Sequence, residues 1–142
     1  MLDEAEVSVL DCVLIEPMVL RDDHAMLGGE KTQRIVDAFR REGPEKVEQL
    51  AASVALGDWE STAAAAHALK SAAGQLGLKA LEAAARVLEA AASQHDEQRV
   101  LDGQRELPDL FNRSLAVLED LWSSLQEVDG TAMDQASAAA KR

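Results

Sequence analysis

The chain has 142 residues, of which 47% are hydrophobic, so it is long and apolar enough for one domain with its own core. Aromatic residues make up only 3% and alanine is abundant, which favours closely packed helices over a sheet sandwich. The formal net charge of −12 argues against a surface for nucleic acid or an anionic membrane. A single cysteine, Cys12, excludes an internal disulfide and favours a reducing cytoplasm, and no apolar run is long enough to span a membrane.

The N-terminal part is predicted to lead into a short helix. Apolar residues within 1–16 fit neither a strand nor one helical stripe, so this stretch is interpreted as a linker or as a lead-in segment that packs on the domain. A short helix is expected to start at Pro17, because proline at the first helical position loses only an N–H that has no partner there. Gly28 and Gly29 are expected to end it.

The next two helices are predicted to be separated at Gly57 and Asp58. A helix is predicted from about Glu30, with a kink or a break at Gly43-Pro44, where proline removes a backbone hydrogen bond. Gly57 is expected to end it. Asp58 is expected to cap the following helix, which is predicted to run from about Trp59 to Gln75.

The C-terminal half is predicted to hold two more helices. After a turn at Gly77, an apolar stripe predicts a helix that runs antiparallel to its predecessor, because the turn is short. The polar stretch 94–103 is expected to contain a connection, and Pro108 is expected to start the last long helix. The fold prediction is all-α: an antiparallel four-helix bundle at 17–128 with a short extra N-terminal helix, followed by a frayed tail at 129–142.

One face of the helix at 59–75 combines a histidine and a lysine with very small side chains. At about 100° per residue, this face is formed by Ala63, Ala64, His67, Lys70, Ser71 and Gly74. The opposite side has the spacing of a core stripe, with Ala65, Leu69, Ala72 and Leu76. A helix that exposes a histidine and surrounds it with short side chains is suited to the approach of another protein.

The side chains of this face offer one nucleophile and one positive charge. The imidazole of His67 offers a nitrogen lone pair as a nucleophile, for which we favour Nε2, and the Lys70 ammonium can balance negative charge. The alternative is a solvent-facing histidine beside a solubilising lysine, with no further role. Gly74 in mid-helix costs about 1 kcal/mol relative to alanine. Close approach of a partner or of the neighbouring helix would explain it, as would a role in starting the turn at Gly77.

The segment from His67 to Gly74 has the sequence His-Ala-Leu-Lys-Ser-Ala-Ala-Gly, and Leu76-Gly77 follows it. It resembles the signature of histidine-containing phosphotransfer (HPt) domains of multistep two-component signalling. The resemblance extends more weakly over about residues 15–125 as a helix pattern. It implies a four-helix bundle whose histidine, here His67, carries a phosphoryl group between receiver-domain aspartates, while Lys70 balances the phosphoryl charge. One departure is Ser71, where the family often has glycine.

The resemblance also implies a residue that orients His67. Family members often supply glutamine or a similar group from the next helix, and Glu89 occupies the matching position near the level of His67. Its alternative is an ordinary surface charge. Gln75, at the end of the same helix as His67, is the second candidate.

The sequence gives little support to a metal site or to a cofactor-binding site. His24 and His95 lie beside acidic residues but have no third ligand at a suitable spacing, so no metal site is predicted. Trp59 and Trp122 are interpreted as packing residues. No Gly-rich phosphate loop is present, so the chain is not expected to bind ATP or any other cofactor, and Mg²⁺ would come from the partner receiver domain.

The functional hypothesis is a phosphocarrier with no turnover of its own, in which His67 accepts a phosphoryl group from one receiver aspartate and passes it to another. Expected partners are response-regulator receiver domains, a hybrid sensor kinase, or both, with no nucleic acid and no direct membrane contact. We expect a monomer in the cytoplasm, either free or as the cytoplasmic end of a membrane-anchored kinase. Two alternatives stay open: a docking module without phosphotransfer, and a chemotaxis-kinase-type domain phosphorylated from ATP by a separate catalytic domain.

Overall fold

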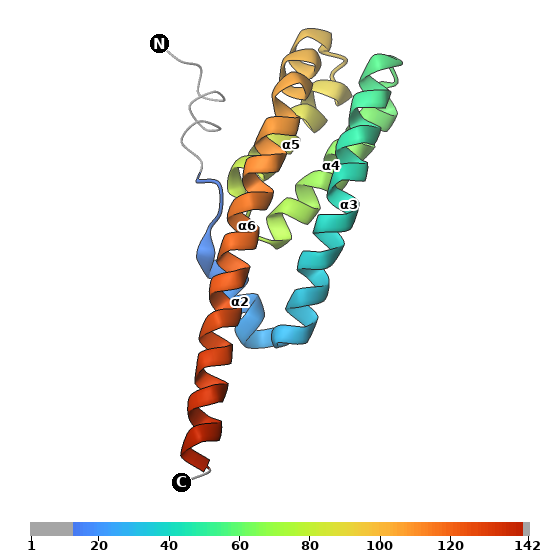
Figure 1. Cartoon of the computed structure of the whole chain (residues 1–142). Coiled ribbons are helices and arrows are strands. Elements are labelled where there is room, and N and C mark those ends of the chain that lie inside the picture. The colour runs from blue at the N-terminus through green and yellow to red at the C-terminus, as the bar shows by residue number, and fades with distance from the viewer. Residues whose placement is uncertain (1–12, 141–142) are drawn as a thin grey trace.

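The structure, a computed structural model, describes the backbone of residues 13–140 and the side chains of residues 13–127. Within this range the chain is all-α (Figure 1). Its helices are α2 (Pro17–Leu27), α3 (Gly29–Ala55), α4 (Trp59–Gln75), α5 (Lys79–Ser93) and α6 (Glu97–Ala140). The predicted fold class is therefore confirmed.

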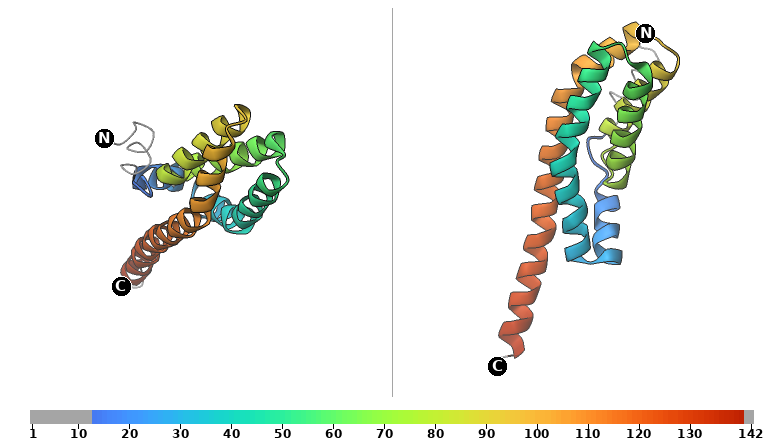
Figure 2. Two further views of the ribbon diagram at one scale, coloured as in Figure 1. Left: turned by 90° about the horizontal axis from the view of Figure 1, so that it is seen from above. Right: turned by 90° about the vertical axis from the view of Figure 1, so that its right-hand side faces the viewer.

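The four longer helices α3 to α6 run alternately up and down and form an antiparallel bundle (Figure 1). The hairpin of α4 and α5 covers one half of the layer made by α3 and α6, and the short α2 lies beyond its end against the other half (Figure 2). Connections of three residues join α3 to α4 and α4 to α5, so neighbouring helices must be antiparallel. This arrangement leaves α4 between α3 and α5, with one side open to solvent.

The core is built mainly from leucine and alanine. Alanine dominates the facing surfaces of α4 and α5, which lets these two helices approach closely. Trp122 is 3% exposed and Trp59 packs against the core, as predicted for both. The most deeply buried leucine and valine side chains are Leu20, Val36, Leu50, Leu69, Leu76, Leu78, Leu81, Leu88, Val100, Leu107 and Leu118.

A kink or a break was predicted at Gly43-Pro44, and the break is wrong, because α3 continues as one helix through both residues. Pro44 faces solvent, where water can satisfy the carbonyl that lacks its helical donor. Gly43 is buried, and a Cβ there would lie only 2.5 Å from the Phe111 ring of α6. The absence of a side chain at Gly43 therefore makes room for the Phe111 ring of α6.

The predicted boundaries of the last helix are also corrected. The connection is limited to 94–96, and α6 begins at Glu97, with Pro108 inside it. The Asp96 side chain accepts a hydrogen bond from the Arg99 amide at 3.3 Å, and the fully buried Val100 anchors the first turn in the core. Pro108 is exposed, so its ring does not disturb the packing.

The helix also continues where a frayed tail was expected. The backbone of α6 stays helical through Asp129 and Gly130 to Ala140, and this part extends beyond the bundle (Figure 1). Alanine, which is abundant in this stretch, has the highest helix propensity and so favours a helical backbone. The division of the chain into lead-in, bundle and tail stays a prediction.

The start of α2 is tied to the turn between α4 and α5. The Glu16 side chain accepts from the Met18 amide at 3.2 Å and Pro17 is the first helical residue, as predicted. The Glu16 amide donates to the Gly77 carbonyl at 2.7 Å, and the Ala80 amide donates to the Val13 carbonyl at 3.1 Å. The described end of the lead-in thus packs on the bundle, while residues 1–12 lie outside the described range.

Ser114 offers a test of the packing between α6 and the core. Its side chain is fully buried, and its hydroxyl has no hydrogen-bond partner among the described residues. Ser114→Ala is expected to leave the free energy of unfolding unchanged or to raise it by up to about 1 kcal/mol, measured by urea denaturation. Thr62→Val is the control, because the equally buried Thr62 hydroxyl donates to the Asp58 carbonyl at 2.8 Å and its loss lowers stability. A clear loss of stability in Ser114→Ala would contradict the prediction.

Candidate functional site

The helix α4 presents His67 to solvent, as its sequence pattern predicted. The Asp58 side chain caps the helix by accepting hydrogen bonds from the Ser61 hydroxyl at 2.7 Å and the Ser61 amide at 3.1 Å, which lower the pKa of Asp58. The imidazole side chain of His67 is 64% exposed. Ala64 and Ser71 beside it are exposed as well, while Ala63, Lys70 and Gly74 are half-buried.

Glu89 of α5 contacts both functional candidates on α4. Its Oε2 lies 2.8 Å from Nδ1 of His67, and its Oε1 accepts from Nζ of Lys70 at 3.1 Å. Because α4 and α5 run antiparallel, Glu89 stands at the same level as these two residues, in the place that the resemblance indicated. One carboxylate thus bridges the histidine and the lysine.

The surroundings of Glu89 favour its charged form. About a quarter of its side chain is exposed, as is about a quarter of Lys70. Burial by itself would raise the pKa of Glu89, but the hydrogen bonds and charges of Lys70 and His67 outweigh it and hold the pKa below its usual range. Glu89 is therefore an anion at neutral pH, although the chain as a whole is strongly acidic.

The carboxylate of Glu89 selects one tautomer of His67. An ionised carboxylate only accepts hydrogen bonds, so we assign a proton to Nδ1, which faces it. Nε2, the other ring nitrogen, then carries the lone pair of the neutral imidazole. The arrangement holds the ring by one nitrogen and leaves the other to react.

Gln75 does not take part in this arrangement. It lies eight residues after His67, about 12 Å further along the helix axis, because each residue adds about 1.5 Å. Its side chain lines a groove between α3 and α4, on the side of α4 turned away from Glu89. The structure therefore separates Gln75 from the ring that it was a candidate to orient.

Gly74 has a neighbour on α5 that the sequence did not reveal. A Cβ at Gly74 would lie 2.8 Å from Oε2 of Glu82, and the other carboxylate oxygen of Glu82, Oε1, pairs with Arg86 at 2.9 Å. The Glu82 side chain of α5 thus occupies the space above Gly74. Close approach of the neighbouring helix was one of the explanations that the sequence left open for this glycine. A long side chain such as Glu82 is flexible, so its position over this glycine has no sequence signature.

The other histidines and the acidic residues assemble no comparable site. The ring of His24 packs edge-on against Trp122, with centroids 5.5 Å apart, and His95 lies in the turn before α6. Within residues 13–127, no three histidine, cysteine or acidic side chains come together as metal ligands would. None of the helices described has the length and apolar character needed to cross a membrane.

Together these features define a class of protein: a helical bundle that displays one exposed histidine, held at Nδ1 by a carboxylate of the next helix, with a lysine one turn away. The sequence model of the Hpt domain matches residues 34–131, which include His67, Lys70 and Glu89, and the chain belongs to the Hpt domain family. No curated protein and no solved structure gives a match. Domains of this family are phosphocarrier modules that interact with receiver domains in phosphorelays, so the chain has a phosphotransfer role.

Proposed function

We propose that His67 is the phosphoryl acceptor and that it shuttles the group between aspartates of two receiver domains. The observation that carries this proposal is the exposed imidazole whose Nδ1 is held by Glu89 at 2.8 Å. With a proton on Nδ1, the Nε2 lone pair attacks the phosphorus of an aspartyl phosphate. The N–P bond forms, the P–O bond to the aspartate breaks, and the aspartate leaves as a carboxylate. In the second transfer a receiver carboxylate attacks the phosphorus and the N–P bond electrons return to Nε2.

Lys70 and Glu89 stabilise opposite charges during this exchange. Phosphorylation at Nε2 makes the Nδ1-protonated ring a cation, which the Glu89 carboxylate stabilises. The Lys70 ammonium, held by Glu89 at 3.1 Å, lies one helical turn from His67 and can turn toward the phosphoryl oxygens. We propose that the receiver domain supplies Mg²⁺ and that this chain binds no cofactor.

The approach of the receiver needs a low surface around His67. Ala63, Ala64 and Ser71 provide it, because their side chains are shorter than the imidazole, whereas the Glu82 side chain of α5 occupies the space above Gly74. The proposal includes a monomer that acts in the cytoplasm. Association is expected to be modest, since a carrier must release each partner after transfer.

The deciding experiment measures phosphoryl transfer from receiver domains charged with labelled phosphate to the wild type and to His67→Gln. An acid-labile, base-stable label on the wild type and none on His67→Gln would support the proposal. His95→Gln is the matched control, because His95 is also an exposed histidine but lies in the turn before α6, and it should be labelled like the wild type. If no receiver of the source organism labels the folded wild-type bundle, the chain is a docking module without phosphotransfer.

A further inference from the structure

Ser71 carries an exposed hydroxyl at the position where the chain departs from the family pattern. Within residues 13–127 this hydroxyl has no hydrogen-bond partner. The Thr62 hydroxyl on the same helix, by contrast, donates to the Asp58 carbonyl four residues earlier at 2.8 Å. Ser71 makes no such bond to the carbonyl of His67, so its hydroxyl is available to a ligand.

The hydroxyl of Ser71 lies close to the imidazole of His67. The two residues are four apart on α4, and residues at this spacing have Cβ atoms about 5–6 Å apart. Side chains of a helix tilt toward its N-terminal end, so the Ser71 hydroxyl lies over the turn that leads back to His67. A phosphoryl group on the imidazole would place its oxygens beyond the end of the ring, and this extension brings them within reach of the hydroxyl.

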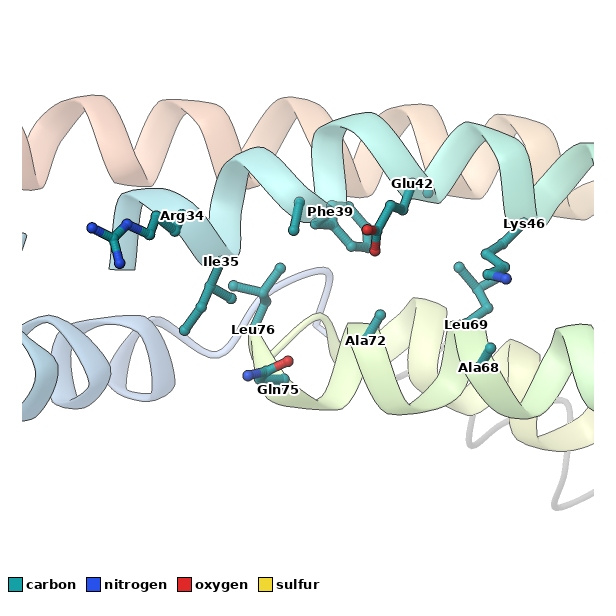
Figure 3. Close-up of a pocket in the computed structure, with 12 residues that line it drawn as sticks. Arg34, Ile35, Phe39, Glu42, Lys46, Ala68, Leu69, Ala72, Gln75 and Leu76 are labelled. Carbon is teal, nitrogen blue, oxygen red and sulfur yellow. The ribbon is translucent and has the colours of Figure 1, made fainter. Parts of the chain in front are cut away.

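Ser71 and Lys70 lie on opposite sides of His67. Lys70 is displaced around α4 by about 60° toward α5, where Glu89 holds its ammonium at 3.1 Å. Ser71 is displaced by about 40° in the other direction, toward Ala68. Figure 3 shows Ala68 at the mostly apolar groove between α3 and α4. Ser71 therefore flanks the histidine on its α3 side.

The ring of His67 turns its reactive nitrogen toward this side. Nδ1 lies 2.8 Å from Oε2 of Glu89, which belongs to α5. Nδ1 and Nε2 point in nearly opposite directions from an imidazole ring, so Nε2 faces away from α5. A phosphoryl group on Nε2 would thus project past Ser71, while the Lys70 ammonium would reach it from the α5 side.

We propose that the Ser71 hydroxyl donates a hydrogen bond to a phosphoryl oxygen on Nε2 of His67 and thereby shifts the transfer equilibrium toward the phosphohistidine. This inference rests on the proposed function, which places the phosphoryl group on His67. A hydrogen bond to a charged acceptor is stronger than one between neutral groups. Because Ser71 has no partner within residues 13–127, the chain gains this bond on phosphorylation and breaks none to form it. The glycine that the family often has at this position offers no such donor.

The test measures the equilibrium constant of transfer between one labelled receiver domain and four forms of the chain. Ser71→Ala removes the hydroxyl, Ser71→Thr keeps it, and Ser123→Ala removes a hydroxyl at an exposed site on α6; the fourth form is the wild type. The proteins are mixed at concentrations below the dissociation constant of their complex, so the equilibrium constant depends on the free species and not on docking. In addition, each form is phosphorylated with phosphoramidate, a small donor that needs no receiver, and the phosphohistidine is examined by phosphorus NMR.

Ser71→Ala is expected to move the equilibrium constant about fivefold toward the phosphorylated receiver and to change the chemical shift of the phosphohistidine, whereas Ser71→Thr and Ser123→Ala should match the wild type. An unchanged equilibrium constant in Ser71→Ala would overturn the inference, even if transfer became slower, because slower transfer alone would mean that Ser71 acts in docking. An equal shift in Ser71→Ala and Ser71→Thr would overturn it as well, since the hydroxyl would not be its cause. A failure of the proposed function is recognised separately, by label that persists in His67→Gln.

Discussion

Replacing Glu89 by alanine is expected to slow phosphoryl transfer to His67 by roughly 100-fold, and replacing it by glutamine by roughly tenfold. Alanine removes the acceptor that lies 2.8 Å from Nδ1, so the ring loses both its tautomer preference and its orientation. Glutamine can still accept from Nδ1–H through its amide oxygen, but it removes the negative charge that holds Lys70 and stabilises the phosphorylated ring. The measurement is the single-turnover rate of transfer from a labelled receiver domain.

Glu119→Gln is the matched control for these variants. Glu119 also forms an ion pair across two helices, with Arg40 at 2.9 Å, but it lies on α6 beside α3 and away from His67. Transfer to this variant should match the wild type. Equal rates for wild type and Glu89→Ala would show that Glu89 is an ordinary surface charge, which was the alternative at the sequence level.

The lowered pKa of Glu89 also sets a pH dependence of stability. Because the folded-state pKa is below the usual value, ionised Glu89 stabilises the fold at pH values above the usual carboxyl range. This contribution, about 1 kcal/mol for a partly exposed charged network, is lost as the pH falls through the lowered pKa. The free energies of unfolding of wild type and Glu89→Gln should therefore differ at neutral pH and converge in acid.

Gly77→Ala is expected to lower the free energy of unfolding by about 3–4 kcal/mol. Gly77 has φ +74°, which an alanine adopts only with strain. In addition, a Cβ there would lie 2.8 Å from the Glu16 carbonyl oxygen and 2.8 Å from the Val19 Cβ. The methyl group would thus push the start of α2 away from the turn between α4 and α5.

The variant Gly57→Ala separates the cost of backbone strain from the cost of the steric contact. Gly57 has a similar φ of +67°, but a Cβ there would meet no atom within 4 Å. Urea denaturation should show a loss of only about 1 kcal/mol for Gly57→Ala, from backbone strain alone. Equal losses at the two glycines would mean that the contact with the lead-in contributes nothing to stability.

Gly77 belongs to the segment that resembles a phosphotransfer signature, and the sequence predicted only that this glycine makes the turn. The turn is confirmed by its positive φ. The structure adds a second constraint, because the backbone of Glu16 lies against it and donates to its carbonyl at 2.7 Å. A distant chain segment produces this contact, so the local sequence carries no sign of it.

The sequence alone determined those features that depend on a single segment of the chain. The cap at Asp58, the glycine at Gly57 and the apolar spacing of α4 were enough to predict its bounds and to place His67 on its exposed face, because both depend on the helical repeat within one segment. The same local rules allowed a break at Gly43-Pro44 and a helix start at Pro108, and the structure has neither. In both places tertiary packing keeps the helix intact despite a residue with poor helix propensity.

The tertiary structure decided how the helices meet around His67. Whether Glu89 contacts the ring depends on the rotation and the level of α5 against α4, which no single helix encodes. Gln75 is separated from the ring by the rise of α4 itself, because both residues lie on that helix. The same packing joins Lys70 to Glu89 and places an apolar groove on the α3 side of the histidine. The helical repeat of each segment sets which side chains share a face, and the packing between segments sets which faces form a site.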